Sequence, residues 1–135
     1  MKILITGSCG FIGFSLAKYF LNKKYEVIGL DNMNNYYNPT LKKRRLKILL
    51  IQKKFKFFKV DISDKNKLSK IFKTNKFSSI YHLAAQAGVR YSIDFPDVYF
   101  KSNILGFYNL ISLAKDYKSG PFFYASTSSV YGDQK

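Results

Sequence analysis

Cysteine and histidine are almost absent from this 135-residue chain, which has one of each. A single cysteine, Cys9, cannot form an internal disulfide, so the sequence excludes a small secreted scaffold held together by disulfides. One His and one Cys also give no cluster of metal ligands, and we expect no metal site. Long apolar runs are lacking as well, since none approaches the ~20 residues that cross a bilayer. We therefore expect a cytoplasmic protein without a membrane-spanning segment.

Acidic residues are scarce: 8 Asp and Glu stand against 23 Lys and Arg, for a formal net charge of +15. Such an excess can indicate nucleic-acid binding, because Lys and Arg neutralise phosphates. Here the lysines are spread along the chain, and only Arg44, Arg45 and Arg90 are arginines. The abundance of Lys, Asn, Ile, Phe and Tyr is typical of A/T-rich codons. We therefore interpret the charge as a solvated surface and expect no nucleic-acid partner, although the basic segment 41–59 keeps that alternative open.

Apolar residues make up 47% of the chain and aromatic residues 18%, which indicates a folded protein rather than a disordered one. Short apolar runs predict strands at 2–6, 25–30, 55–60, 79–83 and 121–125, and helical spacing predicts helices at 11–21, 40–50, 64–74 and 97–118. Strands that alternate with helices form a parallel sheet covered on both faces. The predicted fold class is therefore α/β, a doubly wound parallel sheet of the Rossmann type. We expect residues 1–135 to be one dinucleotide-binding domain that is truncated after the fifth strand.

Two of the predicted helices show an apolar face. In segment 11–21 the positions that recur at helical spacing are Phe11, Ile12, Ser15, Leu16, Tyr19 and Phe20. Thr40 is expected to cap the next helix, whose stripe is Leu41, Leu46, Leu49 and Leu50. We expect both faces to pack against the sheet.

Three glycines follow the first predicted strand in the spacing Gly-x-x-Gly-x-x-Gly, at Gly7, Gly10 and Gly13. A loop of this kind before a helix can bind a diphosphate, because glycine permits close backbone approach and the free N–H groups of the helix start face the ligand. Asp31 ends the second strand, ~20 residues further on, where an acid can bind the ribose hydroxyls of adenosine. No Arg stands beside Asp31 to hold a 2′-phosphate, so the sequence predicts NAD rather than NADP as cofactor.

Simpler explanations remain open for these residues. Three glycines can form an ordinary turn before a helix, and Asp31 can be a strand-end turn residue. Cys9, inside the loop, is interpreted as a small loop residue rather than a reactive thiol. His82 ends an apolar run and is interpreted as a structural histidine near the cofactor.

Further motifs follow in a fixed order along the chain. They are Thr6-Gly7 through Gly13, Asp31-Asn32, Asp61-Ile62, His82-Leu83-Ala84-Ala85-Gln86-Ala87-Gly88-Val89-Arg90, Tyr99 with Ser102-Asn103, and Tyr124 through Gly132. With these motifs the sequence resembles the extended short-chain dehydrogenase/reductase family, and within it the nucleotide-sugar 4-epimerases. Segments 31–46 and 84–92 are similar to those of UDP-glucuronate 4-epimerases in particular.

The resemblance implies a reaction in which bound NAD takes a hydride from C4 of the sugar, a 4-keto intermediate turns over, and the hydride returns to the other face. It implies cofactor contacts at Gly7, Gly10, Phe11, Ile12, Gly13, Asp31, Asn32, Asp61, Ile62, Leu83, Ala84, Ala85, Asn103 and Ser126. It assigns Thr127 as the catalytic residue that bonds the reacting hydroxyl. It implies substrate contacts at Gly88, Val89, Arg90, Ser128 and Ser129, with UDP-glucuronate as the substrate.

The family's proton-transfer pair, a Tyr followed four positions later by Lys, normally lies on the helix after the fifth strand. Tyr131 and Lys135 have that spacing but lie in the loop that the family writes as Val-Tyr-Gly, so we do not assign them this role. The resemblance therefore implies an amino-terminal part that lacks the substrate domain and is inactive alone. It also implies a homodimer in the full-length form, through the helix at 97–118. The alternatives are a related decarboxylase or 4,6-dehydratase, or a catalytically silent NAD-binding module.

Overall fold

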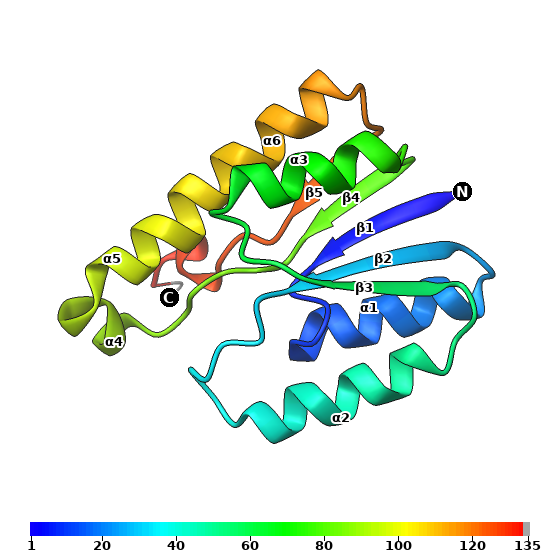
Figure 1. The fold of residues 1–135 in the computed structure, drawn as a ribbon. Coiled ribbons are helices and arrows are strands. Elements are labelled where there is room, and N and C mark those ends of the chain that lie inside the picture. The colour runs from blue at the N-terminus through cyan, green and yellow to red at the C-terminus, as the bar shows by residue number, and fades with distance from the viewer. Residues whose placement is uncertain (134–135) are drawn as a thin grey trace.

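A computed structural model describes residues 1–133 of the chain, except for the side chains of Ser128 and Ser129. It contains five strands, namely β1 (Lys2–Thr6), β2 (Glu26–Asp31), β3 (Phe55–Lys59), β4 (Ser79–His82) and β5 (Phe122–Tyr124). They form one sheet in the order β3-β2-β1-β4-β5, and every neighbouring pair is parallel. The predicted fold class, a doubly wound α/β sheet, is confirmed (Figure 1).

Helices cover both faces of this sheet (Figure 1). They are α1 (Phe11–Asn22), α2 (Pro39–Leu50), α3 (Lys65–Thr74), α4 (Val89–Asp94), α5 (Pro96–Tyr99), the π-helix η1 (Phe100–Gly106), α6 (Phe107–Asp116) and the 3₁₀-helix η2 (Ser128–Tyr131). On one face α1 and α2 lie side by side, and on the other α3 packs along α6. Among the described residues, no helix is long and apolar enough to span a membrane.

The core is split into two halves by the pleat of the strands. Ile3 and Ile5 of β1 pack with α1 and α2, whereas Leu4, between them, packs with α3 and α6. This alternation follows from the period of two in a strand, which sends successive side chains to opposite faces. Because both faces are covered, β1 is apolar at every one of these positions.

The predicted apolar face of α1 is right only in part, since Leu16 and Phe20 pack against the core whereas the other apolar members do not. Phe11, Ile12 and Tyr19 are 76%, 62% and 54% exposed, and the helix instead turns Gly13, Ala17 and Leu21 to the sheet. These three residues lie four apart and therefore share one face of the helix. Small side chains at the first two positions let the helix axis approach the strands closely.

The start and the buried side of α2 also differ from the prediction. Asn38, not Thr40, is the N-cap: its side chain accepts a hydrogen bond from the Thr40 amide, and Pro39 occupies the first turn. Leu49 is fully buried as expected, but Leu50 is 55% exposed. The helix buries Lys42 in its place, with consequences for the site described below.

The long helix predicted at 97–118 is interrupted. Three consecutive helical segments, α5, η1 and α6, cover 96–116, and the seven residues of η1 are π-helical. A π-helix adds a residue to the turn and is common near functional sites. Helix α4 was not predicted at all, because its six residues are too few to show a helical period.

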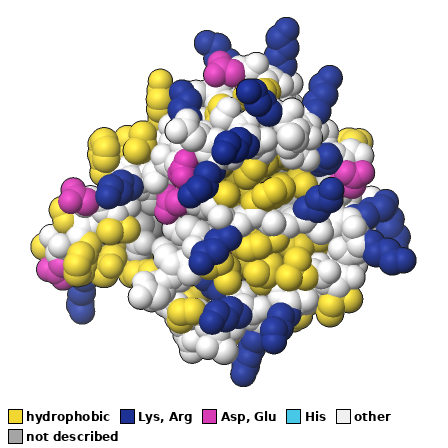
Figure 2. Space-filling model, in the orientation of Figure 1, with side chains coloured by type: hydrophobic (Ala, Val, Ile, Leu, Met, Phe, Trp, Pro, Cys, Tyr) yellow, Lys and Arg dark blue, Asp and Glu magenta, His cyan; other side chains and the backbone are white. Residues whose placement is uncertain are grey.

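The basic side chains are distributed over the surface. Figure 2 shows Lys and Arg scattered across the whole visible face, with apolar patches between them, rather than gathered into one stripe. On this face the distribution supports the interpretation of the charge as a solvated surface.

Candidate functional site

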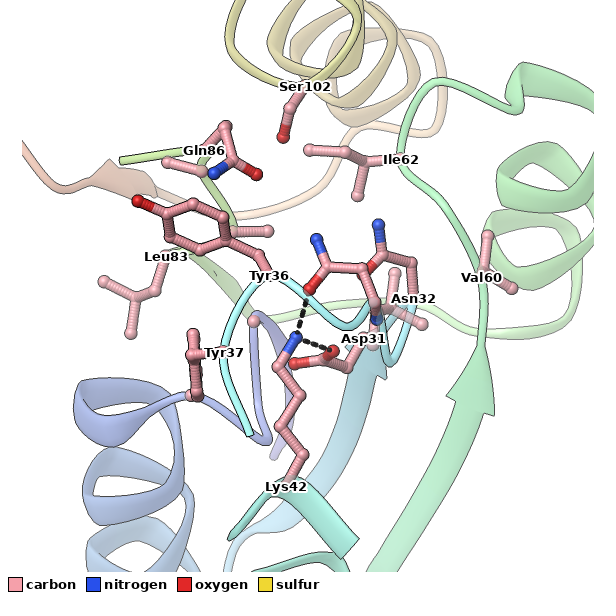
Figure 3. A pocket seen from close by; sticks show the side chains of 16 residues that line it. Asp31, Asn32, Tyr36, Tyr37, Lys42, Val60, Ile62, Leu83, Gln86 and Ser102 are labelled. Carbon is pink, nitrogen blue, oxygen red and sulfur yellow. Dashed lines mark hydrogen bonds and ion pairs between the residues drawn. The ribbon is translucent and has the colours of Figure 1, made fainter. Parts of the chain in front are cut away.

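The order of the strands reverses between β1 and β4. Strands β2 and β3 follow β1 on one side of it, whereas β4 and β5 lie on the other side. In open α/β sheets, ligands bind at such a switch point, beyond the carboxyl ends of the strands. A pocket lies there (Figure 3). Its lining residues are Gly7, Gly10, Leu30, Asp31, Asn32, Asn34, Tyr36, Tyr37, Lys42, Val60, Ile62, Leu83, Ala84, Ala85, Gln86 and Ser102.

The glycine loop forms one wall of this pocket. Gly7 has a φ of +67°, and a Cβ there would lie 2.9 Å from both the Ala84 amide nitrogen and the Leu83 carbonyl oxygen. Only glycine allows this close approach of the loop to the end of β4. The Gly10 amide donates to the Gly7 carbonyl (2.9 Å), and α1 begins directly afterwards. The loop therefore presents backbone and a helix N-terminus to the pocket, as a diphosphate site requires.

Cys9 is buried within the loop. Burial, followed by the charge of Asp31, raises the pKa of its thiol to about 12. A thiol with this pKa is protonated near neutral pH and is a poor nucleophile. The interpretation of Cys9 as a loop residue rather than a reactive thiol agrees with this environment.

Asp31 lies at the end of β2 with its carboxylate turned toward the glycine loop. Oδ2 accepts a hydrogen bond from the Cys9 amide (3.1 Å), and Oδ1 accepts one from the Met33 amide (2.9 Å). The Lys42 ammonium lies 3.3 Å from Oδ1, and both side chains are almost completely buried. These contacts fix the carboxylate at the pocket wall, where the sequence predicts that it binds ribose hydroxyls.

Just beyond the ends of β2 and β3, the side chains of Asn32 and Asp61 are joined by a hydrogen bond. The Asn32 side-chain amide donates to Oδ2 of Asp61 (2.9 Å), and Oδ1 of Asp61 accepts from the backbone and hydroxyl of Ser63. Burial acts to raise the pKa of Asp61, but these hydrogen bonds outweigh it and the pKa is lowered. Asp61 therefore stays ionised and holds the turn that brings Ile62 into the pocket.

Behind the pocket, Thr6 connects β1 to β4. Its hydroxyl oxygen accepts hydrogen bonds from the amides of Leu83 (3.2 Å) and Ala84 (3.1 Å) and lies 2.7 Å from Nδ1 of His82. A hydroxyl has one proton and two lone pairs, so with both lone pairs engaged it donates to Nδ1. Neutral His82 then carries its own proton on Nε2, and Thr6 fixes the backbone of two pocket residues.

The buried imidazole should make stability depend on pH. Burial lowers the pKa of His82 from 6.5 to about 4, so between these values the unfolded chain binds a proton that the folded protein does not. We expect the contribution of neutral His82 to the free energy of unfolding to be fully present above pH 6.5. It should decrease as the pH drops toward 4, by about 3 kcal/mol in total. Urea denaturation at a series of pH values measures this slope.

The matched control is His82→Asn, which keeps an acceptor for the Thr6 hydroxyl but does not titrate. Its unfolding free energy should decrease less between pH 6.5 and 4 than that of the wild type. Equal pH dependence in the two proteins would contradict a neutral, buried His82.

Asn103, on the π-helix η1, bonds to the backbone of the pocket loop. Its side chain accepts from the Gln86 amide (2.8 Å) and donates to the Gln86 carbonyl (2.9 Å). Both ends of the carboxamide are thereby engaged, and Gln86 is held at the pocket wall. In this arrangement Asn103 acts on the pocket through Gln86.

The structure brings together many, but not all, of the predicted cofactor residues. Of those predicted, the pocket is lined by Gly7, Gly10, Asp31, Asn32, Ile62, Leu83, Ala84 and Ala85. Gly13 instead packs under the loop, and Phe11 and Ile12 are exposed on the first turn of α1. Ser126 is exposed in the segment after β5. The roles predicted for these residues stay predictions.

The predicted catalytic and substrate residues lie beyond β4 and β5. Thr127 is exposed just before η2, and the side chains of Ser128 and Ser129 fall outside the described part of the structure. Gly88, Val89 and Arg90 form the exposed start of α4. Gly88 has a φ of +100°, and a Cβ there would lie 2.3 Å from the hydroxyl of Tyr36.

Sequence reasoning missed several pocket residues. They are Leu30, Asn34, Tyr36, Tyr37, Lys42, Val60, Gln86 and Ser102. The sequence does indicate that Lys42 is unusual. It lies four residues before Leu46 and seven before Leu49, and therefore shares their apolar face of the helix. A lysine on an apolar face must find a partner, and here the partners are Asp31 and Asn34.

Comparison with known proteins agrees with this geometry. The sequence profile described as GDP-mannose 4,6 dehydratase matches residues 4–135. The chain belongs to this family. It is 44% identical over 131 residues to a UDP-glucuronate 4-epimerase of Thermodesulfobacterium geofontis, covering 97% of this chain and 41% of that protein. It is likewise 44% identical over 133 residues to UDP-glucuronate 4-epimerase 4 of Arabidopsis thaliana, covering 98% of this chain and 30% of that one.

Among solved structures, this family member resembles the UDP-glucuronic acid 4-epimerase of Bacillus cereus in complex with UDP-glucuronic acid and NAD. The TM-score is 0.88 at 38% identity, over 100% of this chain and 43% of the other. The UDP-Glc/GlcNAc 4-epimerase of Campylobacter jejuni gives a TM-score of 0.85 at 32% identity, over 99% of this chain and 39% of that one. The chain thus spans between 30% and 43% of the length of these relatives.

Proposed function

We propose that this chain is the NAD-binding portion of a nucleotide-sugar 4-epimerase that acts on UDP-glucuronate. The observation that carries the proposal is the pocket at the switch point, where the glycine loop and Asp31 lie on one continuous wall. Its backbone-lined loop suits a diphosphate, and its fixed carboxylate suits a ribose. The relatives named for UDP-glucuronate epimerisation, and the solved one with NAD, support the choice of cofactor and substrate.

The residues of the chain have separate tasks in this proposal. The glycine loop and the start of α1 hold the diphosphate with backbone N–H groups, and Asp31 accepts hydrogen bonds from the ribose. Ile62 and Ala84 bound the pocket as apolar walls that exclude water. Thr127 bonds the hydroxyl at the reacting carbon of the sugar and keeps it oriented. NAD, when bound, supplies reversible hydride transfer at C4 of that sugar.

A titration with NAD tests the proposal, and the quenching of the chain's tyrosine fluorescence reports the binding. We expect saturable binding of NAD by residues 1–135. We expect no conversion of UDP-glucuronate by these residues alone, because about three-fifths of the matched epimerases lies outside the matched region. Adding the remaining portion of such an epimerase as a second polypeptide is expected to restore conversion.

The outcomes separate the alternatives. NAD binding without activity in any combination would favour a catalytically silent module. Loss of CO₂ from UDP-glucuronate would favour a decarboxylase, and formation of a 4-keto-6-deoxy sugar from a nucleotide hexose that carries a C6 hydroxyl would favour a dehydratase. Salt-sensitive binding of DNA together with no binding of NAD would favour a nucleic-acid protein. Turnover by residues 1–135 alone would show that the expected inactivity is wrong.

A further inference from the structure

The segment that connects β2 to α2, residues 32–38, reaches two separate parts of the pocket wall, and we call it the strap. Both of its tyrosines line the pocket. The hydroxyl of Tyr37 lies toward the glycine loop, 3.6 Å from the place that a Cβ of Gly10 would take. The hydroxyl of Tyr36 lies against Gly88, where any Cβ would collide with it. Figure 3 shows the Tyr36 ring beside Gln86. The strap therefore extends from the glycine loop to the segment after β4.

The two ends of the strap are fixed by hydrogen bonds, but its middle is not. Near one end, Asn34 accepts a hydrogen bond from the Lys42 ammonium at 2.8 Å, and at the other Asn38 accepts one from the Thr40 amide at 2.9 Å. Within the described part of the chain, residues 35–37 take part in no hydrogen bond. Both tyrosine rings of the strap are 40% exposed. A segment with so few hydrogen bonds and exposed side chains opens locally at low cost in free energy.

The wall that Tyr36 contacts is, in contrast, held firmly. Asn103 makes two hydrogen bonds with the backbone of Gln86. The Tyr99 hydroxyl lies 2.7 Å from the Ala87 carbonyl oxygen and is also hydrogen-bonded to the Gly88 carbonyl. These contacts tie three consecutive residues to the helical segment behind them. Of the two surfaces that meet here, the strap is therefore the one that can move.

An aromatic pair joins the strap to α4. The centre of the Tyr36 ring lies 4.9 Å from that of Tyr91, with the ring planes inclined at 57°. Tyr91 is itself packed on Phe95, with ring centres 4.6 Å apart. Tyr36 lines the pocket, whereas Tyr91 is not part of its lining. The pair can therefore hold the strap in place through a residue that makes no contact with the contents of the pocket.

We propose that the strap is a lid over the dinucleotide site and that the contact between Tyr36 and Tyr91 is its latch. The strap lines the same pocket as the glycine loop and Asp31, so a dinucleotide enters and leaves when the strap opens. The latch stabilises the closed strap with and without ligand alike, and it therefore slows both entry and release while changing the affinity little. The inference rests on the proposed function of the pocket and deepens it by naming what controls cofactor exchange.

Stopped-flow mixing of residues 1–135 with NADH, the reduced cofactor, tests the inference. The fluorescence of the nicotinamide itself reports binding, so the signal does not depend on any tyrosine. Tyr91→Ala removes the latch and leaves the pocket lining unchanged. We expect the association and dissociation rate constants each to rise roughly tenfold, the effect of losing one aromatic pair. Their ratio, the dissociation constant, should stay within about threefold of the wild-type value because both rates change together.

Tyr36→Ala removes the other half of the latch. It should accelerate association as Tyr91→Ala does, and accelerate release further, because the ring also lines the pocket. Tyr36→Phe keeps the ring and loses only a hydroxyl that makes no hydrogen bond within the described residues, so its rates should stay close to wild type.

Tyr19→Ala is the matched control, because it removes an exposed ring from α1, outside the pocket lining. Its rate constants should stay within about twofold of wild type. Thermal unfolding of each variant shows that it is folded when mixed.

A ring that merely contacts the ligand would change release alone and leave association at the wild-type rate. Unchanged association in either folded alanine variant of the latch, with NADH still bound by the wild type, would therefore overturn this inference and leave the proposed function intact. Failure of the wild type to bind either NADH or NAD would overturn the proposed function, and the inference with it.

Discussion

Replacing Gly13 by alanine is expected to lower dinucleotide affinity at least ~100-fold and to destabilise the fold by about 3 kcal/mol. A Cβ at Gly13 would lie 2.1 Å from the carbonyl oxygen and 2.8 Å from the carbonyl carbon of Gly7. Both atoms belong to the backbone of the glycine loop, so no side-chain rotation can relieve the clash. Either α1 moves away from β1 or the loop loses the geometry that presents its N–H groups to a diphosphate. Quenching titrations and urea denaturation measure the two effects.

Two other substitutions in the same region serve as comparisons. Ser15→Ala changes an exposed residue of α1 and should leave both quantities close to wild type. Gly10→Ala brings a Cβ to 3.0 Å from the Gly7 carbonyl oxygen, a much milder approach, and should have an intermediate effect. If Gly13→Ala bound NAD as tightly as Ser15→Ala does, the glycine loop would not be the diphosphate site.

The strands were predictable because each is a short, mainly apolar run, and in the central strands β1 and β2 nearly every residue is buried. The faces that the helices turn to the sheet were harder to predict. In α1 the large apolar residues Phe11 and Tyr19 are exposed, whereas the small residues Gly13 and Ala17 face the sheet. A pattern based on large apolar residues predicts that Phe11 and Tyr19 face the sheet. The close approach of helix and strand instead requires the small residues Gly13 and Ala17 at that face. The π-helical geometry of η1 was likewise not predicted from the sequence.

Within the site, the sequence identified two kinds of residue. Some line the pocket with their backbone, and others lie at a strand end whose position is fixed by the topology of the sheet. Gly7 and Asp31 belong to these two kinds, since the loop and the end of β2 must meet the pocket in a doubly wound sheet. Lys42 does not, because its distance from Asp31 depends on how α2 packs beneath the loop. No Arg stands beside Asp31 in the sequence, and its cationic partner comes from a helix 11 residues later in the chain.

Thr6→Val is expected to destabilise the protein by about 3–5 kcal/mol, more than any loss of one methyl or one exposed hydrogen bond. Valine has nearly the shape of threonine, so packing is kept while the hydroxyl is lost. The amides of Leu83 and Ala84 then lose an acceptor, and Nδ1 of buried His82 loses its donor. Each buried polar group left without a partner costs roughly 1–3 kcal/mol. Because Leu83 and Ala84 line the pocket, NAD affinity should fall together with stability.

Thr6→Ser separates the hydroxyl from the methyl group. It keeps the hydrogen-bonding oxygen and removes only buried apolar surface, so it should cost about 1 kcal/mol and retain NAD binding. Urea denaturation gives the difference in stability between the two variants, and quenching titration gives the difference in affinity. Equal stability of Thr6→Val and Thr6→Ser would contradict the stabilising role assigned to the three hydrogen bonds of the Thr6 hydroxyl. A large gap between them would mean that one hydroxyl, buried behind the pocket, holds β1, His82 and the Leu83–Ala84 backbone in the arrangement that a dinucleotide requires.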